Sequence, residues 1–292
     1  MKISEINIYP IKSLKGITLE SSTVERRGLE FDRRWMIVDA AGKFLTQRQE
    51  PKMATITVEV TNVGLQVTSE NGSSMNVSKP GDDDSRILTK VWGSESEAFE
   101  CDVEANEWFS DVLSREVRLL YMPDDAGRPI NERFNRGGEL VSFADGYPLL
   151  ITAEPSLAML NQKIAETTNA GRLPAPQMLP MRRFRPNLVV SGSDAFAEDD
   201  WKRIRVGNAV LRVTKPCARC VMTTVDPECG KFDAKEPLKT LASFRMARDV
   251  MPERLDTLGL EPTAVFFGMN LVPETTGVEI RVGDEVEILE SF

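Results

Sequence analysis

LRVTKPCARCVMTTVD, residues 211–226, joins a strand-like segment to two cysteines that lie three positions apart. Leu211 and Val213 alternate with polar residues, a pattern typical of a β-strand, and Pro216 is expected to end that strand. Cys220 is followed by Val-Met-Thr-Thr-Val, which are weak helix formers and good strand formers. We therefore expect Cys217 and Cys220 to lie on a connection between two strands, unlike a thioredoxin-type redox pair at the start of a helix.

Period-2 patterning continues along most of the chain, from MKISEINIY at 1–9 to GVEIRVGDEVEIL at 277–289. Helical spacing of apolar residues is clear at 104–116 and 154–168, and 236–249 is a further helix candidate. Three prolines make 170–181 an expected loop. Many short strands with few helices predict a mainly β fold of barrels or sandwiches. We expect two β-rich units: 1–118, with strands to about residue 100 and then a helix, and 119–292.

The charge of the chain argues against some partners. Its net charge is −9 and its pI is about 4.9, so nucleic-acid binding is not expected as the main role. Basic residues nevertheless cluster locally, at 33–34, at 182–185 and around the two cysteines, which suits a small anionic ligand or a set of solvated surface patches. No apolar run approaches the roughly 20 residues of a membrane span, and no signal peptide is visible, so we expect a cytoplasmic protein without membrane contact.

The complete absence of histidine excludes Ser-His-Asp and Cys-His catalysis and histidine-ligated metals. Four cysteines remain, at positions 101, 217, 220 and 229. A reducing compartment disfavours disulfides, and one C-x2-C pair instead of two disfavours structural zinc. From the residues alone, the pair at 217 and 220 is either structural or holds a thiolate whose formation is favoured by Lys215 and Arg219 nearby.

Several motifs together resemble one family. They are YPIKSLKG at 9–16, GLEFDRRWMIVD at 28–39, LTQRQEP at 45–51, FRPNLVVSG at 184–192 and PCARCVMTTVDPECG at 216–230. Their order resembles the MOSC-domain proteins over essentially the whole chain. The likeness is to the branch with an N-terminal MOSC β-barrel domain, which includes the mitochondrial amidoxime-reducing component and its bacterial relatives. The resemblance implies two β-barrel domains with peripheral helices, a bound molybdenum cofactor and the reduction of N-hydroxylated small molecules.

The resemblance also implies roles for individual residues. Cys220 falls at the position of the molybdenum-ligating cysteine, with Cys217 as the alternative, and molybdenum is thiophilic. Lys12 and Arg185 would offset the charge of the cofactor's phosphate, while Ser13 and Asn187 would hydrogen-bond to the phosphate or the pterin. Arg33 would contact the pterin, with Arg34 as its alternative. Asn187 could instead cap a turn.

Asp145 matches an aspartate that lies near the metal in the family, where it would supply a proton or position water. Gly146 and Tyr147 follow it where the family often has a small hydroxyl residue, which puts the contacts there in question. The chain lacks the cysteine pattern of the ferredoxin domain found in some bacterial relatives, so electrons are expected from a separate donor, a ferredoxin, a flavoprotein or a haem protein. The competing hypothesis is a non-catalytic carrier of the cofactor or of sulfur.

Overall fold

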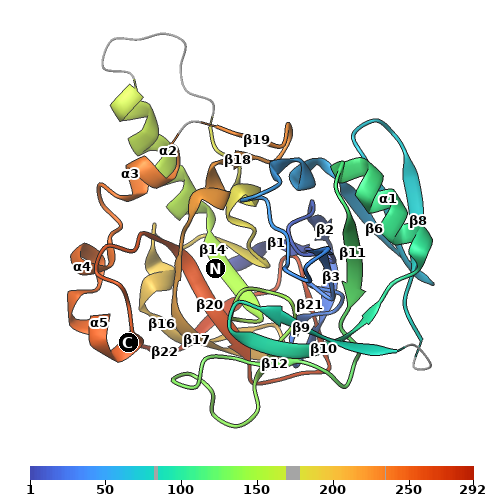
Figure 1. Ribbon diagram of the computed structural model, residues 1–292. Helices are drawn as coiled ribbons and strands as arrows, with labels where there is room; N and C mark the ends of the chain where they lie inside the picture. Colours follow the sequence, from blue (N-terminus) through green and yellow to red (C-terminus); the bar gives the residue numbers. More distant parts are fainter. Residues whose placement is uncertain (82–84, 169–177, 234) are drawn as a thin grey trace.

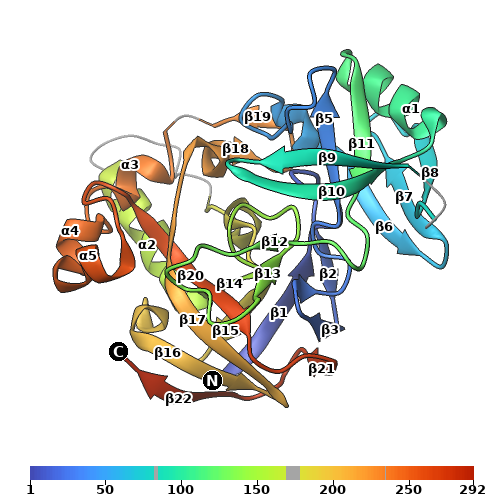
Figure 2. The ribbon, with the colours of Figure 1, turned by 60° about the horizontal axis from the view of Figure 1, so that its bottom comes forward.

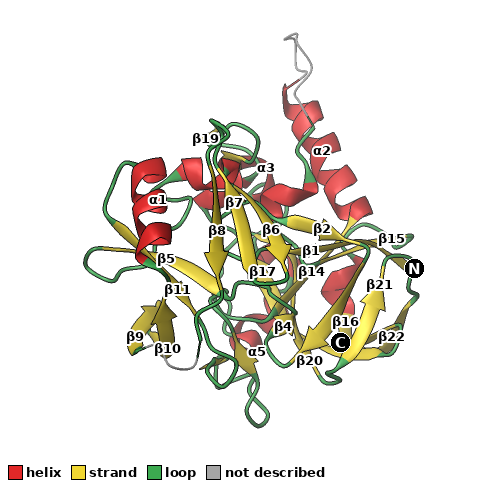
Figure 3. Cartoon of the chain, turned by 90° about the vertical axis from the view of Figure 1, so that its right-hand side faces the viewer, coloured by secondary structure: helices red, strands yellow, loops and turns green. Residues whose placement is uncertain are grey.

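The computed structural model describes residues 1–81, 85–168, 178–233 and 235–292, and most of the expected loop at 170–181 lies outside them. Strands dominate the fold and the helices lie at its periphery (Figures 1 and 3), which confirms the mainly β prediction. Among the described residues, every helix is too short or too polar to span a bilayer.

The largest sheet has eight strands. Their bounds are β1 Lys2–Ile8, β2 Ile17–Leu19, β14 Leu149–Ala153, β15 Leu188–Ser191, β16 Trp201–Val206, β17 Ala209–Ala218, β20 Phe266–Pro273 and β22 Val286–Ser291. They are ordered β2-β1-β15-β14-β20-β17-β16-β22, and only β14 and β15 pair in parallel. The sheet curls so that the start of β22 returns to the start of β1 (Figure 2). Val286 N–H donates to Met1 O (3.0 Å), and Ile3 N–H donates to Asp284 O (2.9 Å).

The remaining strands form smaller sheets, most of them in residues 1–121. The strands are β5 Trp35–Asp39, β9 Arg86–Val91, β10 Ser94–Glu100 and β11 Val117–Tyr121 in one sheet, β6 Thr57–Thr61, β7 Gly64–Thr68 and β8 Ser74–Ser78 in a second, and β3 Ser21–Glu25, β4 Gly28–Leu29 and β21 Val278–Arg281 in a third. Two small hairpins pair β12 Arg128–Pro129 with β13 Leu140–Val141, and β18 Val225–Asp226 with β19 Lys231–Phe232.

The helices are α1 Val103–Leu113, α2 Glu154–Thr168, α3 Leu238–Leu241, α4 Ala247–Val250 and α5 Leu255–Leu258, with 3-10 turns at Pro51–Thr55, Met181–Phe184, Ala197–Asp200, Val221–Thr224 and Pro252–Arg254. The first two match the predicted helices, and α1 buries Phe109 and Leu113 as its apolar spacing requires. The single helix expected over 236–249 is instead two four-residue helices, α3 and α4.

Five clusters of buried apolar residues stabilise the described part of the fold, and two of them are the largest. One fills the curl of the eight-stranded sheet and includes Ile6, Ile151 and Trp201, and the other includes Trp35 and Phe109. Each such buried side chain contributes roughly 1.5–3 kcal/mol relative to exposure. Strands of the two predicted units, 1–118 and 119–292, pair with each other: β1 pairs with β15, and β3 pairs with β21. Because these sheets cross the predicted boundary, the division at residue 118 stays a prediction.

The segment that carries the two cysteines differs from the sequence prediction in two details. Strand β17 does not end at Pro216 but runs on to Ala218 beside β20, with irregular pairing on both sides of the proline, because proline lacks the N–H that a regular ladder uses. Cys220 is followed by the 3-10 turn Val221–Thr224 and not directly by a strand, and β18 begins only at Val225.

Candidate functional site

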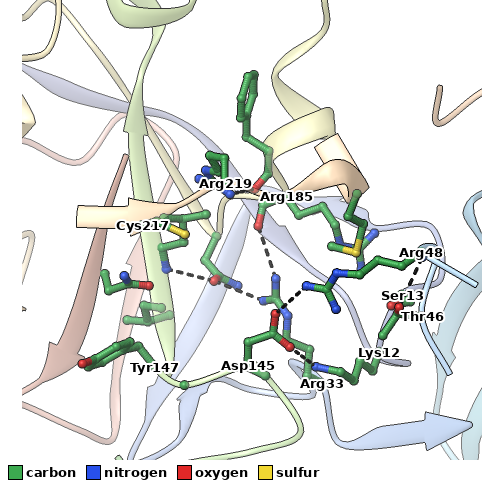
Figure 4. Close-up of a pocket in the computed structure, with 18 residues that line it drawn as sticks. Lys12, Ser13, Arg33, Thr46, Arg48, Asp145, Tyr147, Arg185, Cys217 and Arg219 are labelled. Carbon is green, nitrogen blue, oxygen red and sulfur yellow. Dashed lines mark hydrogen bonds and ion pairs between the residues drawn. The ribbon is translucent and has the colours of Figure 1, made fainter. Parts of the chain in front are cut away.

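A pocket forms where loops of the first part of the chain meet the eight-stranded sheet (Figure 4). Its lining comes from the loop after β1, from the chain on either side of β5, from the approach to β14, from the turn before β15, and from β17 and β20. Six of the seven predicted site residues line it, namely Lys12, Ser13, Arg33, Asp145, Arg185 and Asn187. The family motifs, distant in the sequence, thus meet at one place.

Three of these residues adopt a backbone conformation that is uncommon outside glycine. Ser13, Arg33 and Arg185 have φ angles of 69°, 51° and 54°, in the left-handed region. Such conformations persist only where surrounding contacts enforce them, and they cluster at binding and catalytic sites. Three of the seven non-glycine residues with positive φ in the described chain thus line the pocket.

Two of the predicted arginines share one aromatic ring. The guanidinium carbons of Arg33 and Arg185 lie 4.5 and 4.1 Å from the ring centroid of Tyr9. Arg33 Nη1 donates to the buried carboxylate of Asp32 (2.6 Å), and Arg185 Nη1 donates to Leu14 O (2.7 Å). Arg185 Nη2 is buried without a hydrogen-bond partner among the described residues, and burial lowers the pKa of Arg185 to about 10. Because Arg185 lines the pocket, this unpaired donor is available to an acceptor on a ligand.

Asn187 is held by the backbone around it. Its Oδ1 accepts from Leu150 N–H (3.1 Å) and from Arg33 Nη1 (3.3 Å), and its Nδ2 donates to Asn7 O (3.1 Å). These contacts fix Arg33 against the strands. Asn187 therefore joins two strands of the sheet to the arginine cluster.

The arginine doublet splits between two environments. Arg34 donates through Nη2 to Met122 O (2.6 Å) and Asp124 Oδ1 (2.7 Å), and its guanidinium carbon lies 5.2 Å from the ring centroid of Tyr121. Of the two residues, Arg33 lines the pocket and Arg34 does not. Spacing in the sequence left this choice open, and the structure places Arg33 at the site.

Asp145 faces a buried cation. Lys12 Nζ lies 2.5 Å from Asp145 Oδ1 and donates to Phe143 O (2.8 Å), and Figure 4 shows this contact at the pocket. Burial lowers the pKa of Lys12, and Asp145 only partly restores it. Desolvation raises the pKa of Asp145, but Lys12 and then Arg48 outweigh it and hold that pKa well below its usual range. At neutral pH Asp145 is a carboxylate, which suits positioning of water or charge better than supply of a proton.

The two cysteines differ in their surroundings. Of the described residues that line the pocket, Cys217 is one and Cys220 is not. Burial raises the pKa of the Cys217 thiol, and Arg219 offsets this only in part. Cys220 Sγ instead accepts from Arg48 Nε (3.3 Å) and Nη2 (3.2 Å). Two donors from one guanidinium therefore hold the Cys220 sulfur in place.

Arg48 is the residue that the sequence analysis missed. It lies in LTQRQEP, a stretch used for the resemblance, yet no role was assigned to it. It lines the pocket, contacts Cys220 and lies 3.6 Å from Asp145 Oδ2. A charged residue between two glutamines inside a matched motif was the available signal. Thr46 and Arg219 also line the pocket, and Arg219 donates to Phe184 O (3.0 Å).

The composition of the lining fits an anionic group that contains a soft metal. Its cations are Lys12, Arg33, Arg48, Arg185 and Arg219, and Asp145 is the only carboxylate among the described residues of the wall. Arginine and lysine satisfy phosphate oxygens, and arginine also matches the flat edge of a heterocycle. Two sulfurs that could act as soft ligands lie here, that of Cys217 in the wall and that of Cys220, which is bonded to Arg48 of the wall. The unpaired Nη2 of Arg185 adds a donor ready for such a group.

The fold and site define a class of protein, and comparison with known families identifies it. Residues 1–116 match the MOSC N-terminal beta barrel domain and residues 139–287 match the MOSC domain. The chain belongs to the MOSC-domain proteins.

Within this class, the chain is similar over nearly its whole length to the mitochondrial amidoxime-reducing components. It is 30% identical to component 1 of Xenopus laevis over 295 residues, covering 97% of this chain and 81% of that protein. Component 1 of Mus musculus is 31% identical over 297 residues, covering 98% and 82%, and component 2 of Homo sapiens is 30% identical over 294 residues, covering 97% and 82%.

These relatives correct one prediction. Their names describe them as mitochondrial, which contradicts the cytoplasmic location expected from the sequence. That expectation rested on the lack of a visible signal or membrane segment, which is weak evidence about the compartment.

Proposed function

We propose that this protein is a molybdenum-cofactor-dependent reductase of N-hydroxylated compounds. The observation that carries the proposal is the pocket itself, in which five cations, one unpaired buried guanidinium nitrogen and Cys217 come together, with Cys220 bonded to Arg48 of its wall. The similarity to amidoxime-reducing components supports the type of reaction. When bound, the molybdenum cofactor would supply the electrons for the reduction.

The reaction requires both charge and protons. Conversion of an N–OH group to N–H breaks the N–O bond, takes up two electrons and two protons, and releases water. Asp145, held ionised by Lys12 and Arg48, would position the water molecules that deliver these protons. Proton supply by Asp145 itself is less favoured by its low pKa.

Each remaining residue would have a defined task. Cys220 would ligate the metal, with its sulfur oriented by Arg48, because groups that hold a ligand fix its geometry and charge. Lys12, Arg33 and Arg185 would bind the phosphate and the pterin. Ser13 would add a hydrogen bond from its hydroxyl, and Asn187 would keep Arg33 in place. Cys217, in the wall of the pocket, would remain a thiol.

The electrons would come from a separate protein, of ferredoxin, flavoprotein or haem type. The net charge of −9 would favour a donor with a basic docking face, since complementary charge speeds association. Mixing the protein with each donor class and measuring electron transfer at low and high salt would identify the partner.

The function is tested with purified protein. Bound molybdenum is measured by elemental analysis and pterin by the fluorescence of its oxidised form, and the protein is then supplied with an artificial reductant and benzamidoxime. We expect both components to be present and benzamidine to be formed. Molybdenum without turnover on any N-hydroxylated compound would favour the carrier hypothesis. Absence of binding even when the cofactor is supplied would refute both.

A further inference from the structure

Trp92 is an exposed aromatic residue in a strained conformation. It lies in the turn between β9 and β10, its φ angle is 56°, and 56% of the residue is exposed. A left-handed conformation is costly for a bulky residue, and so is a large apolar ring in water. Glycine and polar residues are the usual occupants of such turns. A tryptophan held there indicates a task outside local folding.

The ring reaches the edge of the pocket. The guanidinium carbon of Arg48 lies 5.1 Å from the ring centroid of Trp92, and the ring of Phe44 packs edge-on at 5.2 Å. The Trp92 side chain is also among the hydrogen-bonding groups that lower the pKa of Asp145. Arg48 and Asp145 both line the pocket, so Trp92 stands at its rim, against two residues of its wall.

We propose that Trp92 forms one wall of the substrate site and selects flat aromatic N-hydroxylated compounds over aliphatic ones. The proposal rests on the proposed function. One side of the ring is taken by Arg48, and the exposed remainder can receive a planar group by offset stacking. Arg48 contacts both the Trp92 ring and Cys220 Sγ, so the proposed stacking surface lies one side chain away from the proposed metal ligand.

Trp92 could instead serve only to hold the Arg48 side chain in place. Substitution of Trp92 would then displace Arg48 and weaken the reduction of aromatic and aliphatic substrates equally. The comparison therefore uses an aromatic substrate, benzamidoxime, and an aliphatic one, acetamidoxime. Trp92→Leu keeps an apolar side chain without the ring, Trp92→Phe keeps a ring, and Leu88→Ala changes an exposed residue of β9.

Stacking contributes up to about a tenfold change in affinity. We expect Trp92→Leu to raise KM for benzamidoxime about tenfold relative to KM for acetamidoxime, since only the aromatic compound loses the stacking contact. Trp92→Phe should retain most of the preference, and Leu88→Ala all of it. An equal rise in KM for both substrates, or no change for either, would overturn the proposal.

Intrinsic fluorescence gives a readout that needs no turnover. Benzamidine, the product of benzamidoxime reduction, should quench the emission of the protein, and Trp92→Leu should remove that quenching. If the protein reduces neither substrate while the quenching depends on Trp92, the proposed function fails and the binding wall stands. If reduction proceeds and quenching is unchanged by the substitution, the wall is refuted and the function stands.

Discussion

Replacing Asp145 with asparagine removes the charge that faces the Lys12 ammonium. The two groups are 2.5 Å apart, and their side chains are 51% and 7% exposed, respectively. A hydrogen bond to a charged group is worth roughly 1.5–3 kcal/mol. Exposure of Asp145 screens part of this, and Lys12 keeps its bond to Phe143 O. We expect Asp145→Asn to lower the free energy of unfolding by about 2 kcal/mol.

The pH dependence of this loss follows from the direction of the pKa shift. Because the folded pKa of Asp145 is lowered, its stabilisation is present above the unfolded pKa of about 3.9 and is lost only as the pH falls through the folded pKa. The difference between wild type and Asp145→Asn should thus be constant between about pH 5.5 and pH 8.

Urea unfolding at both pH values measures this difference, with the exposed Glu107→Gln as a control and a double-mutant cycle with Lys12→Met to isolate the pair. A coupling energy below about 0.5 kcal/mol would refute the inference that the pair is an energetic contact. If Asp145→Asn lowered the free energy of unfolding only above pH 6, Asp145 would titrate near neutrality and could supply protons.

Three other predictions concern charged residues. Arg33→Met should reduce cofactor retention at least about tenfold, because Arg33 lines the pocket. Arg34→Met should lower the free energy of unfolding but retain the cofactor. Equal retention in the two variants would show that Arg33 does not bind the cofactor. Arg48→Met should lower molybdenum retention roughly 10–100-fold, because Arg48 orients the Cys220 sulfur. Arg86, which also lies over an aromatic ring, is the control, and Arg86→Met should leave retention unchanged. Equal retention in the two variants would show that Cys220 is held without Arg48. Burial raises the pKa of Glu198 to about 7, so its stabilising contribution is present below the unfolded pKa and lost as the pH rises through 7. The free energy of unfolding of the wild type should therefore decline by up to about 3 kcal/mol between pH 5 and 8, and Glu198→Gln should remove this decline. Urea unfolding measures it, and an unchanged decline in the variant would contradict the prediction.

Local patterning predicted much of the fold. Alternation in MKISEINIY gives β1, and the spacing of Phe109 and Leu113 gives the buried face of α1. The pairing of β1 with β15, about 180 positions away, could not be read from either strand, because period-2 patterning defines a face and not a partner. The prediction that the strand ends at Pro216 was wrong, because β20 continues to pair with β17 as far as Ala218. This partner strand lies far away in the sequence.

For the site as well, the sequence predicted part of the arrangement and the rest arises from folding. Shared motifs located Lys12, Arg33, Arg185 and the cysteine pair, but their electrostatics arise only on folding. The family resemblance indicated Asp145 as a residue that supplies a proton or positions water, and left the two roles open. Its charge state is set by Lys12, which lies 133 positions earlier in the chain. Arg48 acquired its meaning only when folding brought it to Cys220, 172 positions later.

The assignment of Cys220 as the metal ligand is tested most directly by the molybdenum content of Cys220→Ser and Cys217→Ser. It is measured by elemental analysis on purified proteins that have been supplied with the cofactor. Cys220 is predicted as the ligand because Arg48 holds its sulfur, while Cys217 stays a thiol in the wall. Cys220→Ser should lose the bound metal, and Cys217→Ser should retain most of it. Loss in Cys217→Ser with retention in Cys220→Ser would contradict the assignment, and so would equal loss in both.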